Sequence, residues 1–484
     1  MKIIVIGSGI GGLGVSALLA KNGFEVLVIE KNKNFGGRAR ALKEKGFTFD
    51  LGPSWYMMPD VFENYFSLFG KKSCDFYKLY QLKTHYKIFF ENDIISVKSD
   101  LKENIREFER FEKNSGKKLL KYLEKSKYIY EKAMKDLVYL DYENLRDIIK
   151  PEVILELFKL NLFKSFHDEV KGYFKNDKLQ KTLEFTTVFL GGSPFNTPAF
   201  YTLISHTDFN LKIWHPEGGM NKVSEALFNL CKEYNVKFVF NEEIKKVNIV
   251  DNKINSIEGK KRYYADAFIC NADMIFFDSL LPKEFKVKKN WDKCVLSPSA
   301  FNIYIGINKK LRYVEHHNFY FESSWEKHFE DVYKNPKWPK NPSYYVHIPS
   351  ITDKTMAPKN CESLYFLVPV APGLEEKNFD KNMFADKIIE HFEKVSNQKI
   401  KENIVIKKIF SHNDFIREYN SYKGTAFGLA HTLMQTAILR PKNKGKLNNL
   451  WYVGQYTNPG IGVPTSLISS IITYNSINRW KKKK

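Results

Sequence analysis

The chain has 484 residues, of which 43% are hydrophobic and 15% aromatic. This length exceeds what one hydrophobic core usually supports, so two or more domains are expected. Lysine and arginine number 76 against 55 aspartate and glutamate residues, a formal net charge of +21. The lysines are spread through every segment without a nucleic-acid-binding motif, which excludes nucleic acid as a partner. The charge instead indicates attraction to an anionic membrane surface, or merely a lysine-rich proteome.

The five cysteines are odd in number, scattered and without a C-x-x-C pair. This pattern argues against a disulfide framework and against a metal site. The chain begins with a strand pattern rather than a signal peptide, and its longest uncharged stretch, 447–478, contains glycines, prolines and polar residues. No membrane span is therefore predicted. We expect a cytoplasmic protein, peripheral on the inner face of the cell membrane.

Residues 2–6 are a β-branched, apolar run that predicts a buried parallel strand. The run leads into the pattern G-x-G-x-x-G at Gly7, Gly9 and Gly12. In such a turn the first glycine makes the bend, the second lets the backbone approach a pyrophosphate, and the third lets helix and strand pack closely. A second strand, 24–29, ends at Glu30, near the position of an acid that binds a ribose hydroxyl. The order of these features predicts a dinucleotide site.

A second glycine pair follows, Gly36-Gly37, and it precedes Arg38. An arginine close to the expected pyrophosphate suits charge-assisted hydrogen bonds to phosphate oxygens. This Gly-Gly-Arg resembles the extended FAD fingerprint of the amine-oxidase and phytoene-desaturase flavoproteins.

Residues 101–183 show long helical periodicity with dense lysine and glutamate. Within this region, 153–166 is unusually apolar, which indicates either an interfacial helix with snorkelling lysines or a buried helix of the substrate domain. Residues 211–290 return to the nucleotide domain, so that domain is discontinuous in sequence. Alternating strands at 300–306, 344–348 and 364–368 suit a mostly antiparallel sheet facing a substrate.

The last strand, 450–454, is followed by a glycine loop and a helix to Trp480. This arrangement offers a helix N-terminus, with its partial positive charge, to a polar and electron-rich group.

Taken together, the segments resemble the bacterial carotenoid desaturases of the phytoene-desaturase family. The resemblance extends from Lys2 nearly to Trp480 and includes the Pro-Gly-x-Gly-x-Pro of residues 459–464. The motifs that carry it lie at 7–54, 190–194, 218–220, 424–429 and 454–464. It implies an α/β fold, α+β overall: a Rossmann-like FAD-binding domain, a mixed-sheet substrate domain and a helical subdomain that is a candidate for membrane association.

The resemblance implies the following domains: an FAD-binding domain of residues 1–75, 211–290 and 440–484, a substrate-binding domain of 76–100, 184–210 and 291–439, and a helical subdomain of 101–183. It places the flavin contacts at Gly7, Gly9, Gly12, Glu30, Gly37, Arg38, Ile244, Gly454, Gly462 and Val463. Gln455 stands where related flavoproteins often have an acid near the ribityl chain, and it can still hydrogen-bond a hydroxyl.

The implied substrate is a long isoprenoid, with phytoene as the first expectation. The alternatives are the C30 relative diapophytoene, a later carotenoid intermediate, or an oxygenase or isomerase reaction of the same family. Amine and protoporphyrinogen oxidases share the N-terminal fingerprint but have a different C-terminal loop. Prenyl-protein carriers use the fold without flavin, and they would be expected to have lost the glycine turn or Glu30, which are intact here.

Desaturation would send a hydride to flavin N5 and release a proton from the adjacent carbon. An allylic cation makes its neighbouring C–H strongly acidic, so no dedicated strong base is expected and no catalytic residue is assigned. His206, His215 and His431 lie near the matched segments and are interpreted as structural.

Only one G-x-G-x-x-G occurs, so we expect no NAD(P)H domain and an external electron acceptor, oxygen or a membrane quinone. The terminal lysines, 481–484, are either a contact to anionic lipid or a solvated tail.

Overall fold

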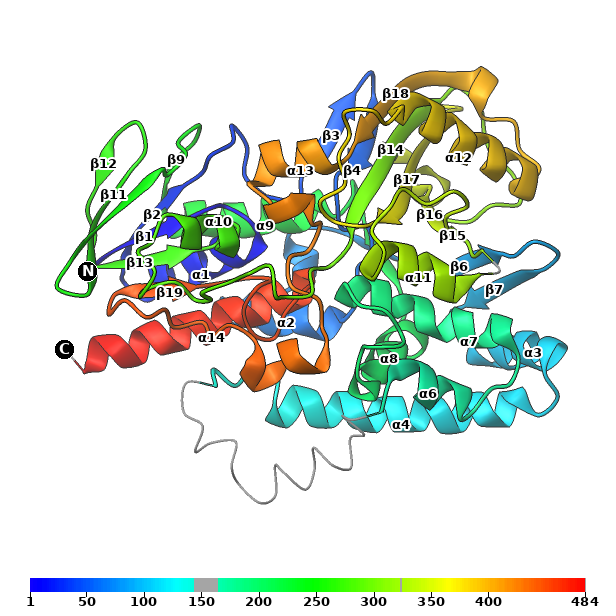
Figure 1. Ribbon diagram of the computed structural model, residues 1–484, viewed down its shortest axis with the longest axis horizontal. Coiled ribbons are helices and arrows are strands. Elements are labelled where there is room, and N and C mark those ends of the chain that lie inside the picture. The colour runs from blue at the N-terminus through cyan, green and yellow to red at the C-terminus, as the bar shows by residue number, and fades with distance from the viewer. Residues whose placement is uncertain (143–163, 323, 484) are drawn as a thin grey trace.

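The computed structural model describes residues 1–142, 164–322 and 324–483. Figure 1 shows a parallel sheet with its helices at one end of the molecule, a larger sheet at the other end, and a group of helices below the larger sheet. The predicted α/β architecture is confirmed. The domain boundaries stay a prediction.

The parallel sheet has the strand order β19-β13-β1-β2-β9, and every neighbouring pair is parallel. Its apolar strands are buried because helices cover one face, and a helix together with a small antiparallel sheet covers the other. The strands are β1 (Lys2–Ile6), β2 (Glu25–Ile29), β9 (Lys237–Val239), β13 (Ala267–Cys270) and β19 (Leu450–Tyr452). The helices packed on this sheet are α1 (Ile10–Lys21), α9 (Asn221–Glu233), α10 (Met274–Ser279) and α14 (Val463–Lys482). Segments from the beginning, middle and end of the chain therefore meet in one sheet.

The larger sheet has the order β18-β14-β17-β16-β15-β6-β7. Its pairs are antiparallel except for β15 with β6, which is parallel, so the expected mixed sheet is present. The strands are β6 (Thr84–Phe89), β7 (Ile94–Lys98), β14 (Ser299–Ile307), β15 (His317–Tyr320), β16 (Tyr344–His347), β17 (Glu362–Val370) and β18 (Ile404–Phe410). Helix α12 (Lys381–Ser396) packs Ile388 and Phe392 onto one face of this sheet. The helices α11 (Trp325–Tyr333) and α13 (His412–Tyr419) lie near its ends.

Three small sheets complete the strand structure. They are β10 (Lys246–Val250) with β11 (Lys253–Glu258) and β12 (Arg262–Tyr263), β3 (Ala41–Glu44) with β4 (Phe47–Asp50), and β5 (Leu79–Gln81) with β8 (Trp214–Pro216). Strand β8 leads directly to α9 of the parallel sheet.

The helical group contains α3 (Leu101–Phe111), α4 (Ser115–Asp136), α6 (Phe166–Lys171), α7 (Asp177–Glu184) and α8 (Leu203–Phe209), and α2 (Pro59–Ser67) lies beside it and contacts α14. The apolar segment 153–166 falls almost entirely outside the described residues. Among the described helices, none is both long enough and apolar enough to cross a bilayer.

Candidate functional site: a cavity between two sheets

One cavity of about 680 Å³ is lined by residues from both large sheets and from the helical group. Nine of the ten predicted cofactor residues line it, namely Gly7, Gly9, Glu30, Gly37, Arg38, Ile244, Gly454, Gly462 and Val463. Gly12 does not. A Cβ there would lie 2.2 Å from the Gly7 carbonyl oxygen, so Gly12 is needed for the packing of α1 against the turn.

The N-terminus of α1 opens into this cavity. Helix α1 begins at Ile10 without a side-chain cap and without an acid in its first turn. Ile10 and Gly11 line the cavity. The first backbone N–H groups of a helix have no partner within the helix, and the helix dipole favours negative charge there. This end of the cavity therefore suits a phosphate group.

The Glu30 carboxylate is buried beside the glycine turn. Its Oε2 accepts hydrogen bonds from the Ser8 backbone nitrogen at 2.8 Å and from the Ser8 hydroxyl at 2.7 Å, and its Oε1 accepts one from the Asn32 backbone nitrogen at 2.8 Å. A carboxylate offers about four lone-pair sites. One site on Oε1 therefore remains for a ligand hydroxyl, as binding to a ribose requires.

Arg38 places a positive charge in the same end of the cavity. Its Nε and Nη2 are buried and have no hydrogen-bond partner among the described residues. The guanidinium lies 5.0 Å from the centre of the Tyr419 ring. Burial raises the pKa of Asp273, and the charge of Arg38 opposes that rise. A buried cation with two free donors fits the pyrophosphate of a dinucleotide.

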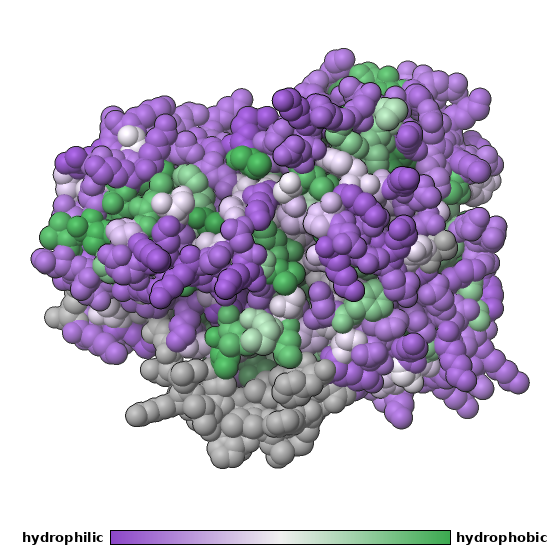
Figure 2. All heavy atoms as spheres, viewed as in Figure 1, coloured by the Kyte–Doolittle hydropathy of each residue, from purple (hydrophilic) through white to green (hydrophobic). Residues whose placement is uncertain are grey.

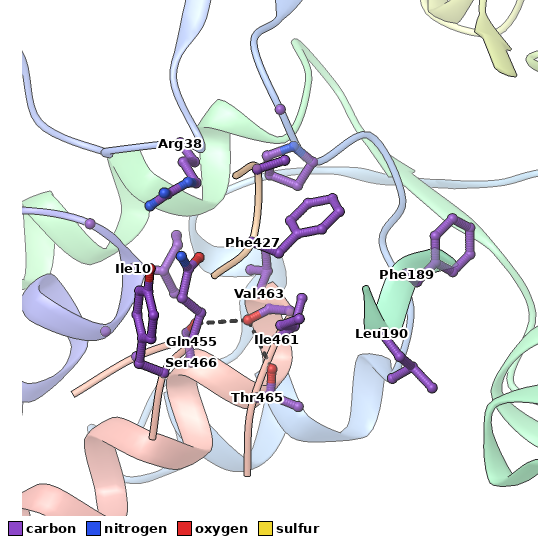
Figure 3. A pocket seen from close by; sticks show the side chains of 18 of the residues that line it. Ile10, Arg38, Phe189, Leu190, Phe427, Gln455, Ile461, Val463, Thr465 and Ser466 are labelled. Carbon is purple, nitrogen blue, oxygen red and sulfur yellow. Dashed lines mark hydrogen bonds between the residues drawn. The ribbon is translucent and has the colours of Figure 1, made fainter. Parts of the chain in front are cut away.

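A second helix N-terminus reaches the cavity from the C-terminal loop. Helix α14 begins at Val463 after Gly462, whose φ of 131° favours glycine. The Gly462 carbonyl accepts hydrogen bonds from the hydroxyls of Thr465 and Ser466, at 2.9 and 2.7 Å. The amide nitrogen of Gln455 is buried and has no partner in the described chain. Figure 3 shows Arg38 and Gln455 on one side of the cavity and Phe189 and Leu190 on the other.

The remainder of the cavity is an aromatic and aliphatic channel in which Trp55 is a central side chain. The Trp55 ring lies 5.2 Å from Phe189, 6.0 Å from Phe319 and 6.3 Å from Tyr345, measured between ring centres. Further lining residues are Met57, Met58, Tyr130, Ala133, Met134, Leu137, Phe185, Val188, Ile204, Phe321, Phe329, Phe427, Leu433 and Ile438. Such a lining suits a long apolar ligand.

Three structural contributors were not predicted from the sequence as site residues. Asn271 donates a hydrogen bond to the Val453 carbonyl at 3.0 Å and lies against the glycine turn, so it joins that turn to the C-terminal loop. The sequence could have indicated Asn271 as a site residue, because it directly follows β13 and the carboxyl ends of parallel strands meet at one edge of a sheet. Tyr419 and Arg440 lie far along the chain from the glycine turn, and no local motif marks them.

The three histidines of the sequence analysis lie in different surroundings. His431 lines the cavity, its Nδ1 is 2.9 Å from the Leu190 carbonyl oxygen, and burial together with Arg440 lowers its pKa to about 3. His206 hydrogen-bonds Asn210 at 2.8 Å and does not line the cavity. His215 lies 3.1 Å from the Asp353 carboxylate, also away from the cavity lining. Their structural role stays a prediction.

The family model described as flavin containing amine oxidoreductase matches residues 10–473. A carotenoid 3,4-desaturase from Haloarcula japonica is 39% identical over 96% of this chain and 96% of its own length. A zeta-carotene-forming phytoene desaturase from Myxococcus xanthus is 31% identical over 99% of this chain and 94% of its own length.

Solved structures show the same fold at low identity. An oxidoreductase from Methanosarcina mazei superposes with a TM-score of 0.64 at 17% identity, covering 99% of this chain and 100% of that one. The family match confirms the expected FAD cofactor and the expected oxidoreductase class. The chain belongs to the flavin containing amine oxidoreductase family and, within it, to the carotenoid desaturases.

Proposed function

We propose that this protein is an FAD-dependent desaturase that introduces double bonds into phytoene during carotenoid biosynthesis. The observation that carries the proposal is the continuity of the cavity. Its polar end has two helix N-termini without a side-chain cap, an unused hydrogen-bond acceptor position on the Glu30 carboxylate, and the unpaired donors of Arg38. Its other end is an apolar channel around Trp55.

We assign the FAD contacts to the ten predicted residues, with Gly12 acting through packing. In this assignment Glu30 would accept a hydrogen bond from a ribose hydroxyl, and Arg38 together with the N-terminus of α1 would hold the pyrophosphate. Val463, at the start of α14, would contact the flavin, and the Gln455 side-chain amide would donate to a hydroxyl of the ribityl chain.

FAD, when bound, supplies the two-electron acceptor for the hydride that leaves the substrate. The channel residues orient the polyene and exclude water. Loss of hydride from one allylic carbon and of a proton from its neighbour leaves a new C=C bond. The electron-rich faces of the aromatic channel residues stabilise positive charge on the polyene. The histidines of the channel, His328 and His431, are buried and have lowered pKa values, in accord with catalysis by positioning rather than by a strong base.

A later, already conjugated carotenoid is the second candidate substrate. It is favoured by the 39% identity to the carotenoid 3,4-desaturase, which is higher than the 31% identity to the phytoene desaturase. Diapophytoene, or an oxygenase or isomerase reaction on a carotenoid, remains a further alternative from the sequence.

We further propose that the channel is loaded from a membrane and that reduced flavin passes its electrons to oxygen or to a quinone. Ile438 and Leu439 line the cavity yet are 40% and 44% exposed, and Met434 nearby is 70% exposed. Figure 2 shows apolar side chains gathered on this face, at the position of the orange turns in Figure 1. Met434 shares a surface hollow with Lys288, Lys289 and Lys293. An apolar patch flanked by lysines suits a bilayer with anionic lipid.

The function is tested by expressing the chain in cells that accumulate colourless phytoene and recording the spectrum of the extracted pigments. A new structured absorption in the visible range is expected, and its position gives the number of new double bonds. A Gly12→Val variant, whose side chain would collide with the Gly7 carbonyl, should leave the cells colourless. Unchanged extracts from cells with FAD-loaded wild-type protein would refute phytoene as the substrate, and feeding conjugated carotenoids then tests the second candidate.

A further inference from the structure

Three histidines from separate parts of the chain meet behind the wall of the channel. His215 lies on β8, His316 directly before β15, and His347 at the end of β16. Each offers a ring nitrogen, and these three nitrogens all lie within 4.8 Å of one another. The side chains are fully buried, with at most 2% of their surface exposed.

The hydrogen bonds of the rings leave one nitrogen of His215 and one of His347, Nδ1 in each, without a partner among the described residues. Nε2 of His347 and Nε2 of His316 are 3.0 Å apart. The second nitrogen of His316, Nδ1, lies 3.0 Å from the Thr352 hydroxyl. Nε2 of His215 lies 3.1 Å from an oxygen of Asp353, and Nδ1 of His215 has no partner among the described residues. His215 therefore shows the arrangement typical of a histidine ligand of a metal ion, in which one nitrogen is held by an oxygen acceptor and the other is free.

A carboxylate lies directly beside this cluster. Asp353 accepts hydrogen bonds from Nε2 of His215 at 3.1 Å and from the Gly218 backbone nitrogen at 2.6 Å. A carboxylate that holds one ring nitrogen of a histidine fixes the orientation of the ring, as it does for histidine ligands of metal ions.

We propose that His215, His316 and His347 form a binding site for one divalent transition-metal ion of the zinc class. Three imidazole ligands leave a fourth position for a water molecule, as in three-histidine zinc sites. Asp353 orients His215 and does not itself bind the ion, because its oxygens already accept hydrogen bonds from His215, Gly218 and Thr355. The proposal departs from the expectation of no metal, which rested on the cysteines, and it is independent of the proposed desaturase function.

The site would connect the two halves of the molecule. His215 lies shortly before the Gly218–Gly219 turn that leads into α9 of the parallel sheet, whereas His316 and His347 belong to the seven-stranded sheet. His317 stacks on Trp55 of the channel, with 4.1 Å between ring centres and 10° between planes. An ion at this point would fix the position of the channel wall relative to the FAD-binding end.

The experiment uses the full chain without a polyhistidine tag, loaded with FAD and stripped of metal by a chelator. Co²⁺ is titrated first, because four-coordinate Co²⁺ absorbs at longer wavelength than flavin, and Zn²⁺ is then added in competition. We expect one Co²⁺ per chain, displacement by Zn²⁺ with a dissociation constant below about 1 μM, and a higher midpoint of thermal unfolding with Zn²⁺.

Two classes of variant distinguish the loss of a proposed ligand from a change in a neighbouring residue. His316→Gln and His347→Gln should weaken Zn²⁺ binding at least about 100-fold, and Asp353→Asn, which alters the partner of His215 without removing a proposed ligand, about 10- to 100-fold. The control is His391→Gln, because His391 is a half-buried histidine bonded to Tyr344 outside the cluster. It should bind Zn²⁺ as the wild type does.

Two results would overturn the proposal. One is a folded, FAD-loaded wild type that gives no Co²⁺ absorption and no change in thermal unfolding with Zn²⁺. The other is Zn²⁺ binding that persists unchanged in His316→Gln and His347→Gln. If these variants do not fold, the wild-type titration alone decides. In either case the cluster would be a group of hydrogen-bonded histidines that does not bind the ion.

Discussion

The guanidinium of Arg440 donates a 2.6 Å hydrogen bond from Nη2 to the backbone carbonyl of Gln455. Arg440 is buried, and it also donates to the carbonyls of Leu429, Gln435 and Thr457. Burial lowers its pKa to about 10. One side chain thus holds the C-terminal loop that enters the cofactor end of the cavity.

We expect Arg440→Lys to lower the free energy of unfolding by about 3 kcal/mol, because a single ammonium group cannot serve four carbonyls and leaves some of them unpaired. The amount of FAD bound per chain should also fall in this variant. Urea unfolding of the FAD-loaded protein measures the change. Arg417→Lys is the matched control: Arg417 is largely exposed on α13, and its replacement should change stability by less than about 0.5 kcal/mol. Equal effects of the two variants would contradict this role for Arg440.

Replacing Glu30 by glutamine should weaken FAD binding by about 10- to 100-fold. The amide removes the negative charge and turns one acceptor oxygen into a donor, so the site can no longer accept from Ser8, Asn32 and a ribose hydroxyl together. Quenching of flavin fluorescence during titration of the apoprotein gives the affinity. Glu25→Gln changes an exposed glutamate at the start of β2, the strand that leads to Glu30, and should leave the affinity unchanged. An affinity of Glu30→Gln equal to that of wild type would remove Glu30 from the cofactor site.

The buried His328 predicts a loss of stability in mild acid. Burial lowers its pKa from 6.5 to about 4. Below pH 6.5 the unfolded chain takes up a proton at this ring while the folded protein does not, so the free energy of unfolding falls as the pH falls. Between pH 7 and pH 5 the cost is about 2 kcal/mol. Denaturant unfolding at both pH values measures this loss. The fall in the free energy of unfolding from pH 7 to pH 5 should be smaller by this amount in His328→Gln than in the wild type. Identical differences in the two proteins would argue against a neutral His328.

The exposed apolar residues at the channel mouth predict binding to vesicles. Ile438→Ser with Leu439→Ser should reduce sedimentation with vesicles containing anionic lipid, since two buried side chains together contribute about 3 kcal/mol or more. Val250→Ser, at an exposed valine of the β10–β11 hairpin, is the control and should sediment as wild type does. Loss of binding in the control alone would place the membrane contact on the parallel-sheet end of the molecule.

The sequence could predict those features that depend on short stretches of chain. Strand β1, the glycine turn, α1 and Glu30 lie within 30 residues, and their order follows from local periodicity and spacing. The strands β14, β16 and β17 were likewise recognisable from alternation of apolar residues.

Contacts between distant segments could not be predicted in this way. Tyr419 reaches Arg38, and Asp353 meets His215 across 138 positions, without any fixed spacing that marks them. The parallel pairing of β15 with β6 depends on the same long-range assembly. Such contacts result from how the two sheets pack, which is decided by shape and burial over the whole fold rather than by a motif.

We propose that FAD in this protein accepts hydride from a carotenoid lying in the channel. The most direct test mixes purified, FAD-loaded protein with phytoene in liposomes without oxygen, and records the flavin absorption. We expect loss of the oxidised-flavin bands, with one new double bond in the extracted pigment for each flavin reduced. Flavin that stays oxidised with phytoene, with diapophytoene and with an already conjugated carotenoid would contradict it.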